Sequence, residues 1–196
     1  NGHGEVNLSS AISYSCDIYF YKTIKYYDFD KLSSFYKIFG FGKPTGVDIQ
    51  GESQGVVPTI DYMNRRYGRS GWSKGSLLNY CIGQGELLVT PMQVFKYTNI
   101  LATKGKSCKP HFVKSHLENK TDTIKISNDV WDRITMDMRK VIIDDNGTGK
   151  AADPLIPNAI VFGKTGTAEN PHGEDHAWFI GWMEYFGRSY SIVVLL

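Results

Sequence analysis

The chain has 196 residues, of which 41% are hydrophobic and 21% are charged, and its formal net charge is +2. These values are ordinary for one globular domain with a sizeable core. A charge this small, with no basic run to concentrate it, argues against nucleic acid as a partner. No apolar stretch approaches the roughly 18 residues of a membrane-spanning helix, and no signal peptide opens the chain, so we expect any membrane anchor to lie outside these residues.

The cysteines and the two ends of the chain add further limits. Cys16, Cys81 and Cys108 form an odd set at irregular spacing, which does not predict a disulfide framework. The chain begins abruptly at Asn1 and stops at Leu196 inside a β-branched strand with no turn after it. We therefore expect an internal piece of a longer protein, truncated at both ends.

The first predicted helical segment runs from Val6 to Tyr27, where apolar residues recur at helix spacing. Ser15 and Asp17 lie within it, and periodicity alone favours one continuous amphipathic helix with both side chains on its polar face. His3 and Cys16 lie before and within the same segment, and both are residue types that bind zinc. Two candidate ligands do not make a site, so coincidence is the simpler interpretation of this pair.

The next helix is predicted from Asp30, as N-cap, to Phe39, with Gly40 just beyond its end. Its apolar face is predicted to consist of Leu32, Phe35, Tyr36 and Phe39. The segment contains a literal Ser-x-x-Lys at Ser34 and Lys37, with the serine one helical turn before the lysine, as an activated nucleophile requires. Because such short matches are common by chance, an ordinary helix surface is the alternative.

The middle of the chain is predicted to be mostly loop with two helices. A short helix is expected near residues 59–66, and a longer one begins with Thr90 as N-cap and Pro91 at its first position. The buried face of the longer helix is predicted to include Met92, Phe95, Ile100 and Leu101. The Gly-Gln-Gly around Gln84 is interpreted as architecture, because glycines let the chain turn tightly against a core, and a catalytic role for Gln84 is disfavoured.

A polar excursion and a further helix follow. Weak strands are predicted at residues 111–115 and 123–126, and Ser127 is predicted to cap the next helix. The apolar positions of that helix repeat at Val130, Ile134, Met138 and Val141 or Ile142. Residues 147–152 are predicted as a flexible connector, since their Gly-Thr-Gly is too short for a phosphate-binding loop.

Strands dominate the last part of the chain. They are predicted at residues 158–168, 176–182 and 190–196, with a polar turn between the first two. Helices early in the chain and hairpin-connected strands late in it predict an α+β fold, with helices packed on an antiparallel sheet.

The first of these strands has chemistry that an ordinary strand would avoid. Lys164 lies between Gly163 and Gly166, so a cation is placed where glycine leaves the strand open to an extended ligand. Thr165 and Thr167 alternate along the strand and offer hydroxyl and backbone N–H groups to a carboxylate or an oxyanion. The alternative is a glycine-interrupted edge strand with one solvated lysine.

Several motifs, in this order along the chain, resemble those of class B penicillin-binding proteins, which are penicillin-recognising serine acyltransferases. They are Ser15-x-Asp17, Gly83-Gln-Gly with Thr90-Pro, Gly147-Thr-Gly, and Lys164-Thr-Gly-Thr with His176-Ala-Trp-Phe. Gly2-His3-Gly4 and Tyr19-Phe20-Tyr21 favour the elongation-type enzymes, the penicillin-binding protein 2 group. The resemblance implies the transpeptidase fold shared with serine β-lactamases, incomplete here, with residues 1–196 as the C-terminal part of that single domain.

The resemblance also implies roles for individual residues. It makes Ser15, Asp17 and Lys164 catalytic, and Thr165, Gly166 and Thr167 substrate-binding. The serine relays protons between two lysines, Lys164 neutralises the substrate carboxylate and tunes the serine, and the Thr167 N–H forms half of the oxyanion hole. The Ser-x-Asp motif is expected at a helix–loop junction, with a break near residues 13–16. Asp17 departs from the more usual asparagine, and an ionised carboxylate accepts hydrogen bonds but cannot donate them.

The implied activity is peptidoglycan D,D-transpeptidation at the periplasmic face of the bacterial inner membrane. Stem peptides, β-lactam antibiotics and the cell-wall elongation machinery are the implied ligands and partners. The family's order places the nucleophilic Ser-x-x-Lys before Ser15, so Ser34 is rejected as nucleophile and this piece alone is expected to be inactive. The alternatives are a β-lactamase or β-lactam sensor, and a non-catalytic binding domain that has lost the serine.

No cofactor is required for this chemistry. Some elongation-type members carry a zinc site beside the second motif, with a histidine and a cysteine at similar spacing and aspartates upstream. On that resemblance His3 and Cys16 are candidate ligands of a structural zinc, and the remaining ligands would precede Asn1.

Overall fold

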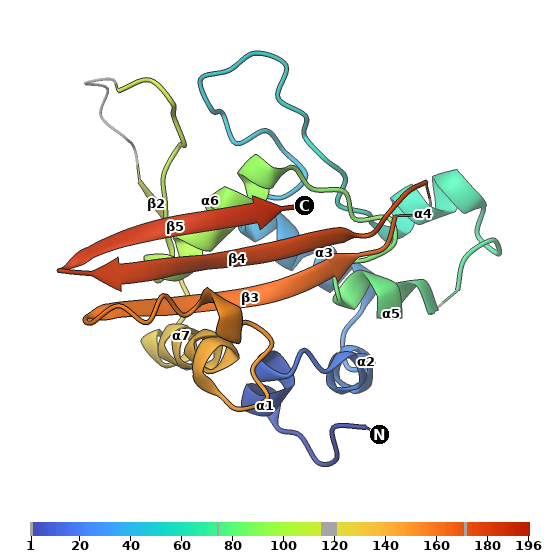
Figure 1. The fold of residues 1–196 in the computed structure, drawn as a ribbon. Coiled ribbons are helices and arrows are strands. Elements are labelled where there is room, and N and C mark those ends of the chain that lie inside the picture. Colours follow the sequence, from blue (N-terminus) through green and yellow to red (C-terminus); the bar gives the residue numbers. More distant parts are fainter. Residues whose placement is uncertain (1, 74, 115–120, 171) are drawn as a thin grey trace.

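The computed structural model describes residues 2–73, 75–114, 121–170 and 172–196. Along the chain its elements are α1 (Leu8–Ser13), α2 (Asp17–Ile24), α3 (Phe29–Ile38), α4 (Ile60–Tyr67), α5 (Gly75–Cys81), α6 (Pro91–Ala102), β1 (Lys106–Ser107), β2 (Asp122–Thr123), α7 (Asn128–Ile143), the 3-10 helix η1 (Lys150–Ala152), β3 (Ala159–Ala168), β4 (His176–Tyr185) and β5 (Arg188–Leu195). Helices fill the earlier part of the chain and the long strands come last, as Figure 1 shows. The predicted α+β class is confirmed.

The long strands form an antiparallel sheet in the order β3-β4-β5. The predicted hairpin is confirmed, with Gly163 opposite Gly181 and Thr167 opposite Ala177. The Phe179 ring lies against this glycine pair, because a Cβ added at Gly163 would come within 2.5 Å of Phe179 Cζ. Since β3 ends the strand order, its outer edge has no strand neighbour within the part of the chain described here.

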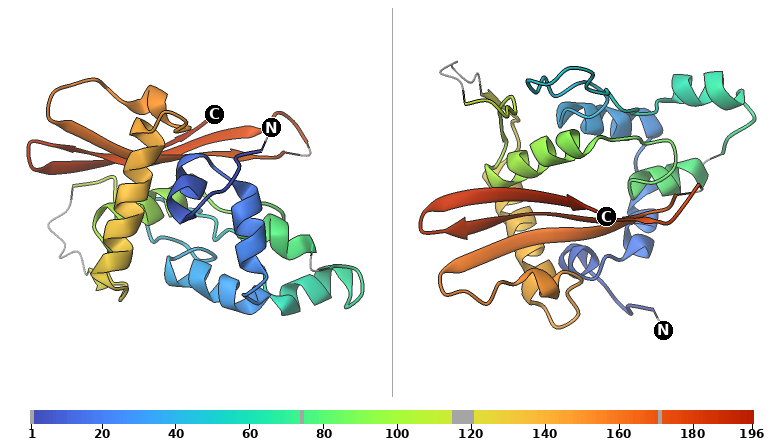
Figure 2. Two further views of the ribbon diagram at one scale, coloured as in Figure 1. Left: turned by 90° about the horizontal axis from the view of Figure 1, so that it is seen from below. Right: turned by 45° about the horizontal axis from the view of Figure 1, so that its top comes forward.

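The main core lies between the sheet and helices α6 and α7. Its buried side chains are Ile100, Leu101, Trp131, Met138, Phe162 and Trp182. Phe162 and Trp182 are cross-strand partners whose rings stack with centroids 4.8 Å apart. Figures 1 and 2 show α6 beside β5 and α7 beside β3, and α1 packs on α7. Since α1 packs on α7 and α7 packs on β3, α7 places α1 close to the edge strand β3.

The start of α6 is as predicted, but its buried face is not. Thr90 caps the helix, and its hydroxyl and the Gln93 side chain form a reciprocal capping box. Gln93 and Val94 are buried in the first turn, in place of the predicted Met92 and Phe95. The buried amide is fully used, because Gln93 Nε2 donates to two backbone carbonyls at 2.8 Å each. Ile100 and Leu101 are buried as predicted.

The helix α3 begins earlier than predicted. Asp28, not Asp30, is its N-cap and accepts the Lys31 N–H at 2.6 Å. Asp30 instead accepts the Ile60 N–H at 3.0 Å, which ties α3 to the first turn of α4. Phe35 was predicted to be buried but is 51% exposed, because the buried face of α3 is centred on Phe29 and Ser33.

Other differences concern short elements. The helix α5 was not predicted, whereas the short helix expected near residues 59–66 is present as α4, with Thr59 as its N-cap. Residues 111–114 form no strand, and Ser115 lies outside the described residues. The second weak strand, predicted at residues 123–126, is wrong except at Thr123, which belongs to the two-residue β2. Val130 on α7 is 48% exposed, although Met138 and Val141 are buried as predicted. Among the described residues, no helix is long and apolar enough to cross a membrane.

Candidate active site

The chain breaks between α1 and α2, at the place expected from the Ser-x-Asp motif. Ser15 has a φ of +55°, in the left-handed region that residues other than glycine rarely adopt. Cys16 then becomes the N-cap residue of α2, with its N–H bonded to the Ala11 carbonyl at 2.8 Å. The alternative of one continuous helix is wrong. The break points the Ser15 hydroxyl towards β3 rather than along a helix surface.

The helix α1 is anchored by a buried charge on α7. Asp137 is only 1% exposed and accepts hydrogen bonds from Ser9 Oγ at 2.5 Å and from Arg133 Nε at 2.9 Å. Lys140 Nζ also donates to Ser9 Oγ at 2.8 Å. Because buried charges are costly unless paired, this network holds the first turn of α1 on α7. At the other end of α1, Ser13 Oγ donates to Asp144 Oδ2 at 3.1 Å, and this contact precedes the Ser15 junction directly.

Lys164 and Ser15 meet, although 149 positions separate them in the chain. Lys164 Nζ donates to Ser15 Oγ at 2.8 Å and to the Thr165 carbonyl at 2.7 Å. Burial lowers the pKa of Lys164 to about 8, against the opposing effect of the nearby Asp17 charge. The alternative of a solvated lysine is therefore wrong, and the group stays mostly protonated at neutral pH.

The outer edge of β3 presents main-chain groups to this site. In an antiparallel ladder a residue turns both its N–H and its C=O towards the partner strand, or neither. The carbonyls of Thr165 and Thr167 bond to the side chains of Lys164 and Gln84, so both residues face away from β4. The Thr167 N–H therefore lies on the open edge, where an oxyanion donor would have to be.

Gly166 keeps one face of this edge clear. A Cβ there would meet only Trp178 Cβ, at 3.6 Å, which is an ordinary contact. Gly166 is exposed and its position lies on the same face of β3 as Lys164. The glycine thus leaves room beside the lysine.

Two residues at this edge, Gln84 and Thr148, lie in motifs that the sequence analysis named, but no place in the site was predicted for either. Gln84 contacts the end of β3, where its Oε1 accepts the Glu169 N–H at 3.3 Å. Thr148 Oγ1 lies 2.7 Å from Thr165 Oγ1, and the Thr148 N–H donates to the Ser13 carbonyl at 3.2 Å. The segment around Thr148, predicted to be a flexible connector, thus bridges α1 and β3. A polar residue between two glycines is the signal that both positions share.

The family described as penicillin binding protein transpeptidase domain matches residues 1–196. The chain belongs to this family. Peptidoglycan D,D-transpeptidase MrdA of Haemophilus influenzae is 36% identical over 222 residues, a match that takes in 100% of this chain and 34% of that protein.

Solved structures agree with this assignment. Penicillin-Binding Protein (PBP2) from Helicobacter pylori matches with a TM-score of 0.88 and 33% identity, over 98% of this chain and 36% of the other, and a second structure holds it in a complex with MreC. Pseudomonas aeruginosa PBP2, in complex with WCK 5153, matches with a TM-score of 0.84 and 30% identity, over 97% of this chain and 44% of the other. These similarities confirm the penicillin-binding protein 2 group. The chain spans about a third of the length of the curated and structural relatives that it matches first.

Asp17 acts on Lys164 through its charge. It lies in the first turn of α2, directly after the Ser15 junction, and is exposed. Its negative charge favours the protonated form of Lys164, and it adds to the effect of burial that raises the pKa of Tyr21. Asp17 thus acts on the lysine at a distance.

His3 and Cys16 line one hollow of about 830 Å³, as the predicted zinc site would require. Cys16 is buried, whereas His3 is exposed and packs edge-on against Tyr14 with ring centroids 6.0 Å apart. Within the described ranges, no three His, Cys, Asp or Glu side chains converge into a group that could hold a metal. These residues therefore do not by themselves supply the four ligands of a structural zinc.

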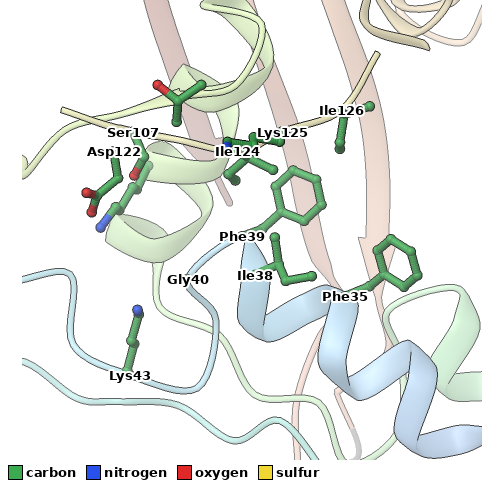
Figure 3. Close-up of a pocket in the computed structure, with 12 residues that line it drawn as sticks. Phe35, Ile38, Phe39, Gly40, Lys43, Ser107, Asp122, Ile124, Lys125 and Ile126 are labelled. Carbon is green, nitrogen blue, oxygen red and sulfur yellow. The ribbon is translucent and has the colours of Figure 1, made fainter.

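The transpeptidase domain has another hollow that takes no part in this site. Figure 3 shows its apolar side, with Phe35, Ile38 and Phe39 from the end of α3 facing Ile124 and Ile126. It shares no residue with β3 or with the Ser15 junction. Ser34, the rejected nucleophile, is exposed on α3. Its hydroxyl donates to the Asp30 carbonyl of the same helix at 2.8 Å, as is usual for a serine on a helix surface.

Proposed function

We propose that the protein containing this chain is a peptidoglycan D,D-transpeptidase that acts by serine acyl transfer and is acylated by β-lactams at the same serine. The observation that carries the proposal is the 2.8 Å hydrogen bond from Lys164 Nζ to Ser15 Oγ, beside the open edge of β3. A partly buried cation next to a hydroxyl can hold or pass a proton, and an open strand edge can pair with an extended peptide. The name of the Haemophilus influenzae relative supports the same activity.

The nucleophile in this proposal is a serine of a Ser-x-x-Lys that precedes Asn1. In the first step its oxygen bonds to the penultimate D-Ala carbonyl, its proton passes through the paired lysine and Ser15 Oγ to the leaving amine, and terminal D-Ala departs. In the second step an amine of another stem peptide attacks the resulting ester and releases the serine. The acyl group is transferred without a redox step or a cofactor.

The described residues supply binding and charge stabilisation in this scheme. Protonated Lys164, with its pKa near 8, neutralises the terminal carboxylate of the substrate together with the Thr165 hydroxyl. The Thr167 N–H provides one oxyanion donor, and the nucleophile's own N–H provides the other. Asp17 contacts the substrate amide as an acceptor, because its carboxylate is exposed beside the Ser15 junction.

Residues 1–196 are, in this proposal, the C-terminal part of one transpeptidase domain held at the periplasmic face of the inner membrane. The anchor belongs to a part of the protein outside this chain. The Helicobacter pylori structure in complex with MreC supports a partner in the cell-wall elongation machinery. Peptidoglycan stem peptides are the natural substrate.

We retain zinc as a proposal with a limited scope. His3 and Cys16 would supply two ligands, and upstream residues would have to supply the others, because the described residues bring no third ligand to them. Bound there, the metal would fix the segment before α1 to the Ser15 junction. Metal analysis of the full-length protein and its Cys16→Ser variant tests this: one zinc per chain in the former and none in the latter is expected, and a full-length protein without zinc contradicts it.

The function is tested by intact mass after incubation with a fluorescent penicillin. We expect one penicilloyl adduct on the full-length protein and none on residues 1–196. An adduct on the short chain would mean that Ser34 or another serine within it is the nucleophile. No adduct on either would favour a non-catalytic binding domain, and rapid release of hydrolysed penicillin would favour a β-lactamase.

A further inference from the structure

The loop that carries Gln84 is fixed at its start by two glycines and the end of α5. Gly83 and Gly85 have φ values of +84° and +75°, which L side chains adopt only with strain. The Gly83 N–H donates to the Tyr80 carbonyl at 3.2 Å, and the Gln84 N–H donates to the Asn79 carbonyl at 2.9 Å. The side chain between the two glycines therefore leaves the loop from a defined place.

The same loop is also fixed on its far side. Glu86 pairs with Arg66 Nε of α4 at 3.2 Å and accepts a hydrogen bond from the Tyr67 hydroxyl. Leu88 then pairs with Val56, exchanging backbone hydrogen bonds of 2.7 and 3.0 Å. Contacts on both sides make residues 83–88 a stiff support rather than a freely moving loop.

From this support Gln84 reaches the end of β3 with both ends of its amide. Its Nε2 donates to the Thr167 carbonyl at 3.0 Å, and its Oε1 accepts the Glu169 N–H at 3.3 Å. These two groups bracket Ala168, where β3 stops. A strand end with no strand neighbour on its outer side is prone to fray, and these two bonds tie it to the loop.

Resting on the proposed function, we infer that Gln84 is a positioning residue for acyl transfer. It fixes the backbone from Thr167 to Glu169. The Thr167 N–H, which lies on the same open edge, therefore stays oriented towards the acyl oxygen. Stabilisation of an oxyanion depends on hydrogen-bond donors that are already in place before the reaction. A donor whose position varies therefore stabilises the oxyanion less. Gln84 itself touches neither substrate nor nucleophile in this scheme.

An opposite reading of the same contact can be tested against it. The Thr167 carbonyl is also an acceptor with which an extended ligand could pair, and on that account Gln84 would obstruct the strand edge. Removal of a support slows acylation, whereas removal of an obstruction speeds it. The sign of the effect therefore decides between them.

The experiment uses the full-length protein and a penicillin whose acylation is followed by stopped-flow fluorescence. Acylation gives two quantities, the affinity before the covalent step (Ks) and the rate constant of that step (k2). For Gln84→Ala we expect k2 to fall about 10- to 100-fold, the scale of a misplacement near 1 Å, with Ks changed less than about threefold. Gln84→Glu keeps the length and the acceptor but loses the donor to Thr167, so an intermediate loss is expected. Gln50→Ala, at an exposed glutamine, is the matched control and should behave as the wild type.

Each outcome supports or overturns the inference. A lower k2 in Gln84→Ala and Gln84→Glu, at unchanged thermal unfolding temperature and Ks, supports it. If the wild type is acylated normally and the k2 of Gln84→Ala is unchanged or faster, the inference is overturned and the proposed function stands. A wild-type protein that is never acylated overturns both. If Gln84→Ala fails to fold, the isosteric Gln84→Glu gives the decision.

Discussion

Two glycines of β3 are predicted to respond oppositely to the same added methyl group. In Gly163→Ala the new Cβ would lie 2.5 Å from Phe179 Cζ and 3.1 Å from the Ile180 carbonyl oxygen, so the ring must move. Because both a ring atom and a backbone oxygen are too close, the overpacking cost lies in the upper part of its usual range, at about 2–3 kcal/mol, and the lower chain entropy of alanine returns about 1 kcal/mol. The net loss is about 1–2 kcal/mol. In Gly166→Ala the nearest atom is 3.6 Å away, so only the entropic gain remains.

The measurement is calorimetric unfolding of the full-length protein, using the transition that bound penicillin shifts to identify this domain. With about 2–4 °C per kcal/mol for a domain of this size, Gly163→Ala should melt roughly 2–8 °C below the wild type and Gly166→Ala at or slightly above it. Gly166→Ala should instead weaken penicillin affinity, because it fills the open face beside Lys164. A Gly163→Ala protein that melts like the wild type would refute the reasoning, since the Phe179 ring would then be free to move aside.

Three further predictions follow from the same contacts. Because Lys164 must be protonated to bind a carboxylate and its pKa is about 8, acylation should fall as pH rises through 8; in Lys164→Arg, measured in the same pH series, that alkaline fall should vanish. Thr148→Val removes the hydroxyl partner of Thr165 and should weaken penicillin affinity several-fold in acylation kinetics, whereas Thr148→Ser should restore it. Asp137→Ala leaves the buried Ser9 hydroxyl without its acceptor, whereas Arg133 is half exposed and can turn to water, so it should cost about 1–3 kcal/mol in chemical denaturation. Asp132→Ala, whose ion pair is exposed, should cost less than about 1 kcal/mol. Equal losses for the two aspartate variants would contradict the assigned role of burial.

The sequence alone determined the features that depend on neighbours within a few positions. The α6 start at Thr90 and Pro91, the short helix α4 and the β3–β4 hairpin were all predicted, because caps, turns and alternation are local signals. The order of the motifs also sufficed to indicate the transpeptidase family. Periodicity failed at Ser15, where one continuous helix fits the apolar pattern but the chain breaks.

Only the tertiary structure decided which distant groups share a site. The Lys164–Ser15 contact joins positions 149 apart, and it exists because the buried Asp137 network holds α1 on α7 while α7 packs beside β3. The burial of Gln93 and the contact of Gln84 with Thr167 could not be predicted either. The sequence does not show which glutamine side chains find backbone groups to bond with in the folded protein. Local patterns are set by steric and hydrogen-bond rules within a turn or two of chain. The site is set by the packing of separate elements, which no short window of sequence contains.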